Sequence, residues 1–148
     1  MTALSGEGSR LIGEVLYGVM QGLPRPASSV GGMVLGAAPL VTSITAYSAM
    51  VGHPLDGFLV RKEAKTHGGG KQIEGHLHPY SRIVLVEDVV TTGGSTLKAI
   101  EAIQDPHPHV DIIAVLALVD RNAGASERFL QRGIPLHTLY GIDAFLQE

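Results

Sequence analysis

Apolar residues recur along the chain in two patterns, one with helical spacing and one made of continuous runs. Within residues 9–21 they fall at spacings i, i+1, i+4, i+5, i+8 and i+9, which mark one face of an α-helix. Ser9 is a suitable N-cap for that helix and Gly22 a suitable end. Residues 82–88 and 110–119 instead contain continuous apolar runs, which are typical of strands buried on both faces.

Further segments continue the alternation of helices and strands. Pro39 falls in the first turn of the helix expected over 37–51, where proline is tolerated. Apolar strands that alternate with helices are typical of a parallel sheet with helices on both faces. The sequence therefore predicts an α/β fold of this kind, with residues 1–148 in a single domain. Further strands are expected over 29–32, 57–62 and 135–140, and further helices over 37–51, 95–104 and 125–132.

Residues 63–78 interrupt the alternation with three consecutive glycines and almost no apolar side chain, so they predict a mobile loop. Four cationic or potentially cationic residues fall at its start, namely Arg61, Lys62, Lys65 and His67. A mobile cationic loop suits a reaction in which pyrophosphate leaves, because it can neutralise developing charge and exclude water. From charge alone, an ordinary solvated loop explains the pattern better.

Composition narrows the classes of function. Hydrophobic residues make up 45% of the chain and charged residues 17%, which is a globular composition. The net charge of −3 provides no basic field for nucleic acid. The chain contains no cysteine, which rules out disulfides and thiolate metal sites and fits a cytoplasmic protein. We expect no signal peptide and no membrane span, because the apolar stretches fall short of about 18 residues.

The stretch IVLVEDVVTTGGST, residues 83–96, places carboxylates, hydroxyls and glycines directly after an apolar strand. Ligands of an open parallel sheet bind beyond the carboxyl ends of its strands. A helix that starts near Ser95 would offer unpaired N–H groups to a phosphate. Glu87 and Asp88 suit sugar hydroxyls better than a phosphate, so the stretch predicts a site for a phosphorylated sugar. A turn merely capped by Asp88 is the structural alternative.

Other ligand motifs fit less well. A Walker A loop requires G-x-x-x-x-G-K-[ST], which does not occur, and the stretch GGGKQIEG lies in a polar loop rather than between a strand and a helix. Two H-x-H pairs can bind metal, but no carboxylate cluster accompanies them, so we expect no metal held by protein ligands. The pairs are His76 with His78 and His107 with His109.

The motif VLVEDVVTTGGS resembles the binding motif for 5-phosphoribosyl 1-diphosphate (PRPP) of type I phosphoribosyltransferases. The order R-K-E-A-K-x-H-G, followed by K-x-x-E-G, resembles the catalytic loop of orotate phosphoribosyltransferases. The resemblance runs from about Ser9 to Leu146. It implies a Rossmann-like core and transfer of the phosphoribosyl group from PRPP to orotate in pyrimidine biosynthesis. It also implies Mg²⁺ as cofactor, carried by PRPP rather than by the protein.

The resemblance further implies a role for each matched position. Lys65 would be the principal catalytic lysine, and Asp88 would also be catalytic. In a homodimer, Arg61, Lys65 and His67 would act in trans at the partner's site, whereas Lys62 would serve its own. The implied PRPP-binding residues are Arg61, Lys62, Lys65, His67, Glu87, Asp88, Val89, Val90, Thr91, Thr92, Gly93, Gly94 and Ser95.

Arg121 follows a buried strand and so reaches the ligand edge of the sheet, where an arginine suits a carboxylate. The resemblance matches Arg121 and Thr91 to the orotate-binding residues of the family, and residues 31–39 to the segment beside the pyrophosphate. A surface arginine that closes a turn is the alternative interpretation.

The resembling family carries an N-terminal hood over the base, and only MTALSGEG precedes the helix expected at 9–21. We therefore expect a core without the hood, and a PRPP half-site more complete than the orotate half-site. A second hypothesis is a non-catalytic or truncated PRPP- or nucleotide-binding module of the same fold. The cationic loop argues against it, since a binder needs no machinery for a leaving group. The loop and Arg121 also disfavour a purine phosphoribosyltransferase.

Overall fold

A six-stranded sheet organises the chain. The computed structural model describes residues 4–64, 66–67 and 70–141. The strand order is β3-β2-β1-β4-β5-β6, and each neighbouring pair is parallel except β2 and β3, which are antiparallel. The strands are β1 (Ser29–Met33), β2 (Asp56–Val60), β3 (Ile73–Gly75), β4 (Arg82–Val90), β5 (Asp111–Asp120) and β6 (Leu136–Gly141).

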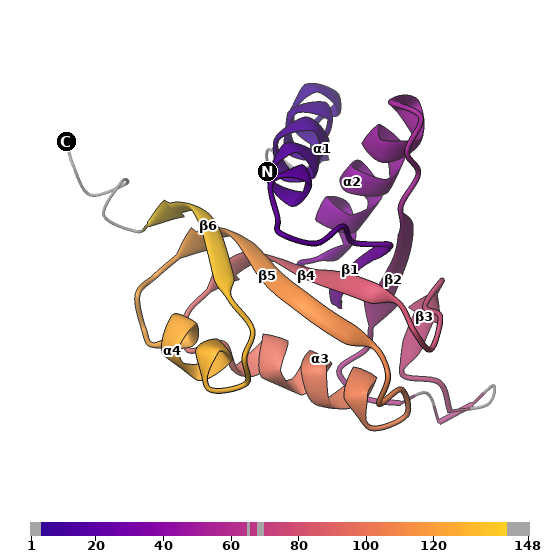
Figure 1. Ribbon diagram of the computed structural model, residues 1–148, viewed down its shortest axis with the longest axis vertical. Coiled ribbons are helices and arrows are strands. Elements are labelled where there is room, and N and C mark those ends of the chain that lie inside the picture. The colour runs from indigo at the N-terminus through magenta and orange to yellow at the C-terminus, as the bar shows by residue number, and fades with distance from the viewer. Residues whose placement is uncertain (1–3, 65, 68–69, 142–148) are drawn as a thin grey trace.

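Helices lie on both faces of this sheet, as the sequence predicts. In Figure 1, α1 and α2 lie above the sheet, and α3 and α4 lie below it. No helix in the described ranges combines the length and apolar character that crossing a membrane requires. The helices are α1 (Gly6–Gln21), α2 (Ala38–Met50), α3 (Gly94–Gln104) and α4 (Ala125–Leu130).

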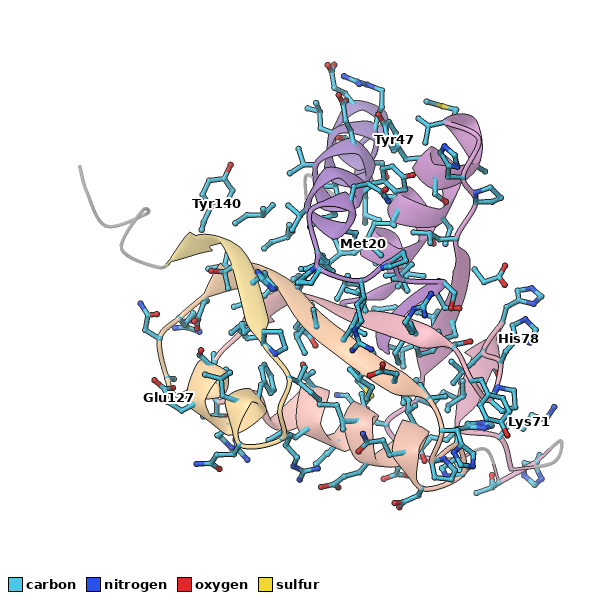
Figure 2. All side chains as sticks on the ribbon, viewed as in Figure 1. Met20, Tyr47, Lys71, His78, Glu127 and Tyr140 are labelled. Carbon is cyan, nitrogen blue, oxygen red and sulfur yellow. The ribbon has the colours of Figure 1, made fainter. Side chains whose placement is uncertain are left out.

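Each face of the sheet has its own apolar core. Met20 of α1 and Ile44 of α2 belong to one core, and Figure 2 places Met20 between α1 and the sheet. Ile100 of α3 and Phe129 of α4 belong to the other. Successive residues of β4 point to opposite faces, so residues 83–86, which lie between the two cores, must all be apolar. Val84 and Val86 enter the first core, and Ile83 and Leu85 the second.

Helix α1 begins earlier than the sequence predicts. Its N-cap is Ser5 rather than Ser9, because the Ser5 hydroxyl accepts a hydrogen bond of 3.0 Å from Gly8 N. Ser9 lies inside the helix, where its hydroxyl is 3.0 Å from the Ser43 hydroxyl of α2. Both serines have capping chemistry. The glycines of the first turn are poor helix formers and made the earlier start hard to predict.

The expected loop over 63–78 contains the short strand β3, so that prediction is wrong for this part. Arg61 N donates to Gln72 O at 2.8 Å and thereby extends the β2–β3 hairpin. Strand β2 ends at Val60, so Arg61 and Lys62 follow the strand instead of completing it. A strand of three residues beside a glycine-rich segment carries no periodic apolar signal.

Candidate functional site

The segments that follow β1, β2, β4 and β5 meet at one edge of the sheet. Val34 N donates to Val60 O at 2.8 Å, and Arg121 N donates to Val90 O at 3.0 Å. The parallel register of the four strands places their carboxyl ends together. The turn after β1, the start of the cationic loop, the acidic end of β4 and the turn after β5 therefore converge where ligands of such sheets bind.

Glu87 and Asp88 lie in β4, which continues to Val90 instead of ending at the acids as expected. Glu87 is half-buried, and Thr96 Oγ1 at the start of α3 donates to its Oε2 at 3.3 Å. Asp88 is exposed and lies against the turn after β1, since a Cβ added at Gly36 would be 3.0 Å from Asp88 Oδ1. The two carboxyl groups thus have different neighbours, a helix start and a glycine turn.

The charge of Glu87 changes near neutral pH. Burial is the main cause that raises the pKa of Glu87 to about 7, and the adjacent carboxyl of Asp88 adds to it. The hydrogen bond from Thr96 acts in the opposite direction and lowers the pKa. A protonated carboxyl can donate a hydrogen bond as well as accept one. Glu87 can therefore either donate a hydrogen bond to a sugar hydroxyl or accept one from it.

The loop between β4 and α3 has the features of an anion site. Gly93 is the N-cap of α3 and adopts the left-handed conformation, with φ of 83°, which glycine tolerates. Gly93 has no side chain that could accept hydrogen bonds from the backbone N–H groups of Gly94 and Ser95 in the first turn of α3. These N–H groups therefore remain available to a ligand. Thr91 and Thr92 are exposed and add hydroxyl groups. Together with the positive end of the helix dipole, these groups suit a phosphate.

The two residues matched to orotate binding lie together. Thr91 directly follows Val90, and Arg121 is held to the Val90 carbonyl through its backbone N–H. Arg121 comes directly after β5 and is exposed, as expected for a residue at the ligand edge. Val89 and Val90 are strand residues, so they belong to the end of β4 rather than to the loop.

Three of the four cationic candidates lie in the described residues, and Lys65 lies outside them. Lys62 and His67 are exposed. Arg61 pairs with Glu74 of β3, because its Nε and Nη2 donate to Glu74 Oε1 at 3.0 and 2.8 Å. Surface ion pairs of this kind contribute about 1 kcal/mol or less, so Arg61 can exchange Glu74 for an anion at little cost.

A cavity of about 810 Å³ opens beside Asp88. Its walls come from α1, the turn after β1, the start of α2, and strands β5 and β6. Two of its lining residues, Leu35 and Tyr140, are 82% and 55% exposed. Figure 2 shows Tyr140 on the α1 side of β6. Since the lining is almost wholly apolar, the space next to Asp88 suits the flat face of a ring.

No contact joins the histidine pairs to Glu87 or Asp88 among the described residues. His78 Nε2 is 3.8 Å from Asp56 Oδ2 at the beginning of β2, and the His109 ring stacks on Tyr80 at a centroid distance of 5.1 Å. Within the described ranges, no three histidine, aspartate or glutamate side chains are grouped to hold a metal ion.

The contacts of the site that were not predicted from the sequence include two between distant segments. Gly36 abuts Asp88, and Arg128 Nη1 of α4 donates to Thr92 O at 2.8 Å. The residues of each pair are far apart in the chain and only the fold brings them together. The small residues of 31–39 were an indication of the first contact, whereas no signal in the sequence pointed to Arg128.

Comparisons with known proteins relate the chain to one family. No protein-family model matches the chain. Orotate phosphoribosyltransferase of Rhodopirellula baltica is 42% identical over 146 residues, which cover 96% of this chain and 75% of the relative. That of Aquifex aeolicus is 41% identical over 140 residues, covering 95% and 74%. The chain therefore spans about three quarters of the length of these relatives.

Solved structures agree with these relatives. Mycobacterium tuberculosis orotate phosphoribosyltransferase in complex with PRPP has a TM-score of 0.82 at 34% identity, covering 96% of this chain and 78% of that one. The same enzyme in complex with Fe(III) dicitrate has a TM-score of 0.83 at 36% identity, covering 96% and 77%. The expected type I phosphoribosyltransferase core is thus confirmed. Because this likeness extends over nearly the whole chain, the protein belongs to the orotate phosphoribosyltransferase family.

Proposed function

We propose that this protein transfers the 5-phosphoribosyl group of PRPP to orotate, giving orotidine 5′-phosphate and pyrophosphate in UMP biosynthesis. The observation that carries the proposal is the acidic end of β4, which leads through a glycine-rich loop into α3, in a chain of this family. The PRPP complex of the Mycobacterium tuberculosis relative supports PRPP as the donor. We place this reaction of nucleotide biosynthesis in the cytoplasm.

In the proposed reaction, the bond from the ribose anomeric carbon to pyrophosphate breaks, a bond to a ring nitrogen of orotate forms, and the proton of that nitrogen is released. Departure of pyrophosphate leaves positive charge on the anomeric carbon. Glu87 and Asp88 hold the ribose hydroxyls and favour that charge electrostatically. The backbone and hydroxyls of residues 91–95 fix the 5′-phosphate at the start of α3. Arg121 orients the orotate carboxylate, and Thr91 contacts both substrates.

Cationic residues of the loop stabilise the departing pyrophosphate. We assign Lys65 the principal role, with Arg61, Lys62 and His67 supplying further positive charge. Lys65 or His67 can also protonate the leaving oxygen. The exposure of Lys62 and His67, and the weak surface pairing of Arg61, are compatible with movement of this loop onto a bound anion.

Mg²⁺ is the expected cofactor, held chiefly by the oxygens of PRPP. The groups near the anion site are two carboxyls and several hydroxyls, which suit a metal that retains water and substrate ligands. When bound, the ion neutralises the pyrophosphate charge. The protein's own part is to hold the ribose hydroxyls through Glu87 and Asp88 and so orient the complex. Removal of divalent cations with EDTA should abolish turnover, and added Mg²⁺ should restore it.

One assay tests the proposed function. The protein is incubated with PRPP, Mg²⁺ and orotate, and loss of orotate absorbance is followed. We expect turnover that Lys65→Ala abolishes and that Lys98→Ala, at an exposed lysine of α3, leaves intact. PRPP binding by calorimetry without turnover would instead favour a non-catalytic or truncated binding module. PRPP binding that is unchanged in Asp88→Ala would refute the proposed role of the acidic pair.

We also propose a homodimer in which each cationic loop completes the site of the other subunit. Lys65→Ala and Asp88→Asn variants, each inactive alone, are co-expressed with different tags. Loops acting in trans leave one intact site in each hybrid dimer, so the mixture should regain about a quarter of wild-type activity. A monomer in analytical ultracentrifugation, or a mixture that stays inactive, would refute this arrangement.

A further inference from the structure

Helix α4 contacts the loop of residues 91–95 at two successive positions, and none of the roles above involves this helix. Arg128 Nη1 donates a hydrogen bond of 2.8 Å to Thr92 O. The next residue, Phe129, is fully buried, and a Cβ added at Gly93 would lie 2.8 Å from its ring. Figure 1 shows α4 beside the start of α3, at the end of the sheet to which β4 leads.

We propose that Arg128 is a positioning residue for the 5′-phosphate of PRPP. By holding the Thr92 carbonyl, Arg128 directs the N–H of Gly93 toward the bound phosphate. The inference rests on the proposed function, in which residues 91–95 bind that phosphate.

The peptide unit between Thr92 and Gly93 couples the direction of the Thr92 carbonyl to that of the Gly93 N–H. The bond between Thr92 and Gly93 is trans, so its C=O and N–H point in opposite directions. Arg128 holds the carbonyl on the α4 side, and the Gly93 N–H consequently faces away from α4. Among the described residues, the Gly93 N–H has no backbone acceptor, which leaves this donor for a ligand.

Loss of the Arg128 hydrogen bond frees this peptide unit to rotate. The rotation changes only ψ of Thr92, which is exposed, and φ of Gly93, which is buried but as a glycine tolerates many conformations. A rotated unit would present the Thr92 carbonyl oxygen to the phosphate, and two negative partners repel each other. Phe129 packs against the Cα of Gly93 but cannot hold the carbonyl, because its ring has no hydrogen-bond donor.

Arg128 is proposed to act by fixing the orientation of the Thr92–Gly93 peptide unit and not through its positive charge. Its side chain is exposed, so solvent and salt screen its charge. The guanidinium group is planar and presents its donors in fixed directions. Arg132 offers a matched control, because it is also exposed and pairs with Glu101 Oε1 of α3 at 3.2 Å rather than with the loop.

The test measures steady-state kinetics and calorimetric binding of ribose 5-phosphate. Arg128→Ala should raise KM for PRPP about tenfold and change kcat less than about threefold, because the phosphate contact is equal in the ground and transition states. Ribose 5-phosphate binding should weaken by a similar factor. Arg132→Ala should leave both values unchanged. Pyrophosphate, which lacks the 5′-phosphate, should bind equally well to the wild type and both variants.

Three outcomes are decisive. Equal binding of ribose 5-phosphate by wild type and Arg128→Ala overturns the inference. If the difference in binding between wild type and Arg128→Ala disappears in about 1 M KCl, where the Debye length is about 3 Å, the difference arises from the charge of Arg128. That result also overturns the inference. A wild type that binds neither PRPP nor ribose 5-phosphate refutes the proposed function instead. Should Arg128→Ala not fold by circular dichroism, Arg128→Met retains the aliphatic chain without a donor and takes its place.

Discussion

Thr96 Oγ1 donates a hydrogen bond to Glu87 Oε2 across 3.3 Å. Thr96 is buried in the first turn of α3, and Glu87 is half-buried near the end of β4. The bond therefore joins the two elements that flank the proposed phosphate loop. It is also one of the causes that set the pKa of Glu87, so the geometry of the loop is coupled to the charge of the acid.

Replacement of Thr96 by valine should raise the pKa of Glu87 further. The hydrogen bond from Thr96 opposes the effects of burial and of Asp88, and valine keeps the shape of threonine without the hydroxyl. The lost bond should also lower the free energy of unfolding by about 1 kcal/mol. A carbon-13 NMR titration of the glutamate carboxyls measures the pKa, with Thr96→Ser as the control that keeps the hydroxyl. An unmoved Glu87 titration in Thr96→Val would contradict this account.

The raised pKa of Glu87 also makes stability depend on pH. The folded carboxyl has a pKa of about 7, compared with 4.5 for the ordinary group. Below pH 4.5 the Glu87 carboxyl is protonated in both the folded and the unfolded chain, and the protein has its full stability. Between pH 4.5 and pH 7 only the folded chain keeps this proton, so the free energy of unfolding falls as pH rises through 7. The total loss is at most about 3 kcal/mol, and partial exposure of the side chain reduces it.

Glu87→Gln should remove this dependence, because an amide does not titrate. We expect the variant to exceed the wild type in stability by about 1–3 kcal/mol at pH 8 and by little at pH 4.5. Urea unfolding at the two pH values measures the difference. Glu63→Gln changes an exposed glutamate outside the sheet and should give no comparable gain. If the advantage of Glu87→Gln were equal at both pH values, titration of Glu87 would not be its cause.

The elements buried on both faces could be predicted from the sequence. The apolar runs that became β4 and β5 face a core on each side, and that requirement appears directly as uninterrupted apolar residues. The acids near the end of β4 and the glycines after it were therefore placed correctly at the carboxyl edge of the sheet. The further neighbours of these two acids were not predictable, because Thr96 and Gly36 reach the carboxyl groups only in the folded chain.

Elements stabilised by distant partners escaped prediction. Strand β3 pairs with β2, and its Glu74 accepts hydrogen bonds from Arg61, the residue that follows β2; neither contact leaves a local pattern. The hydrogen bond from Arg128 to Thr92 spans 36 positions of the chain. Such contacts depend on how helices dock against the sheet, whereas sequence periodicity reports only which side of an element is buried.

A methyl group at position 36 should disturb the acidic pair. The Cβ of Gly36→Ala would lie 3.0 Å from Asp88 Oδ1 and 3.3 Å from Cγ, so the Asp88 side chain must shift by a few tenths of an ångström. Because catalysis is sensitive to the placement of groups that hold the substrate, kcat/KM for PRPP should fall about 10- to 100-fold. Stability should change by about 1 kcal/mol or less, since an exposed side chain can move.

Gly18→Ala provides the control for Gly36→Ala. Gly18 lies in α1 with nothing within 4 Å of an added Cβ. Alanine should stabilise the helix by about 0.5–1 kcal/mol and leave kcat/KM unchanged. Equal activities of the two variants would show that Gly36 is not required beside Asp88.

Gly93→Ala and Gly124→Ala separate backbone strain from steric contact at the phosphate loop. Both glycines are N-caps in the left-handed conformation, with φ of 83° and 99°. Each alanine should therefore cost about 1–2 kcal/mol of unfolding free energy from backbone strain. Only at Gly93 would the methyl group meet the Phe129 ring, at 2.8 Å, since nothing lies within 4 Å at Gly124. Gly93→Ala should consequently be the less stable variant in urea unfolding and should bind PRPP more weakly, and equal losses in the two variants would show that Phe129 does not require glycine there.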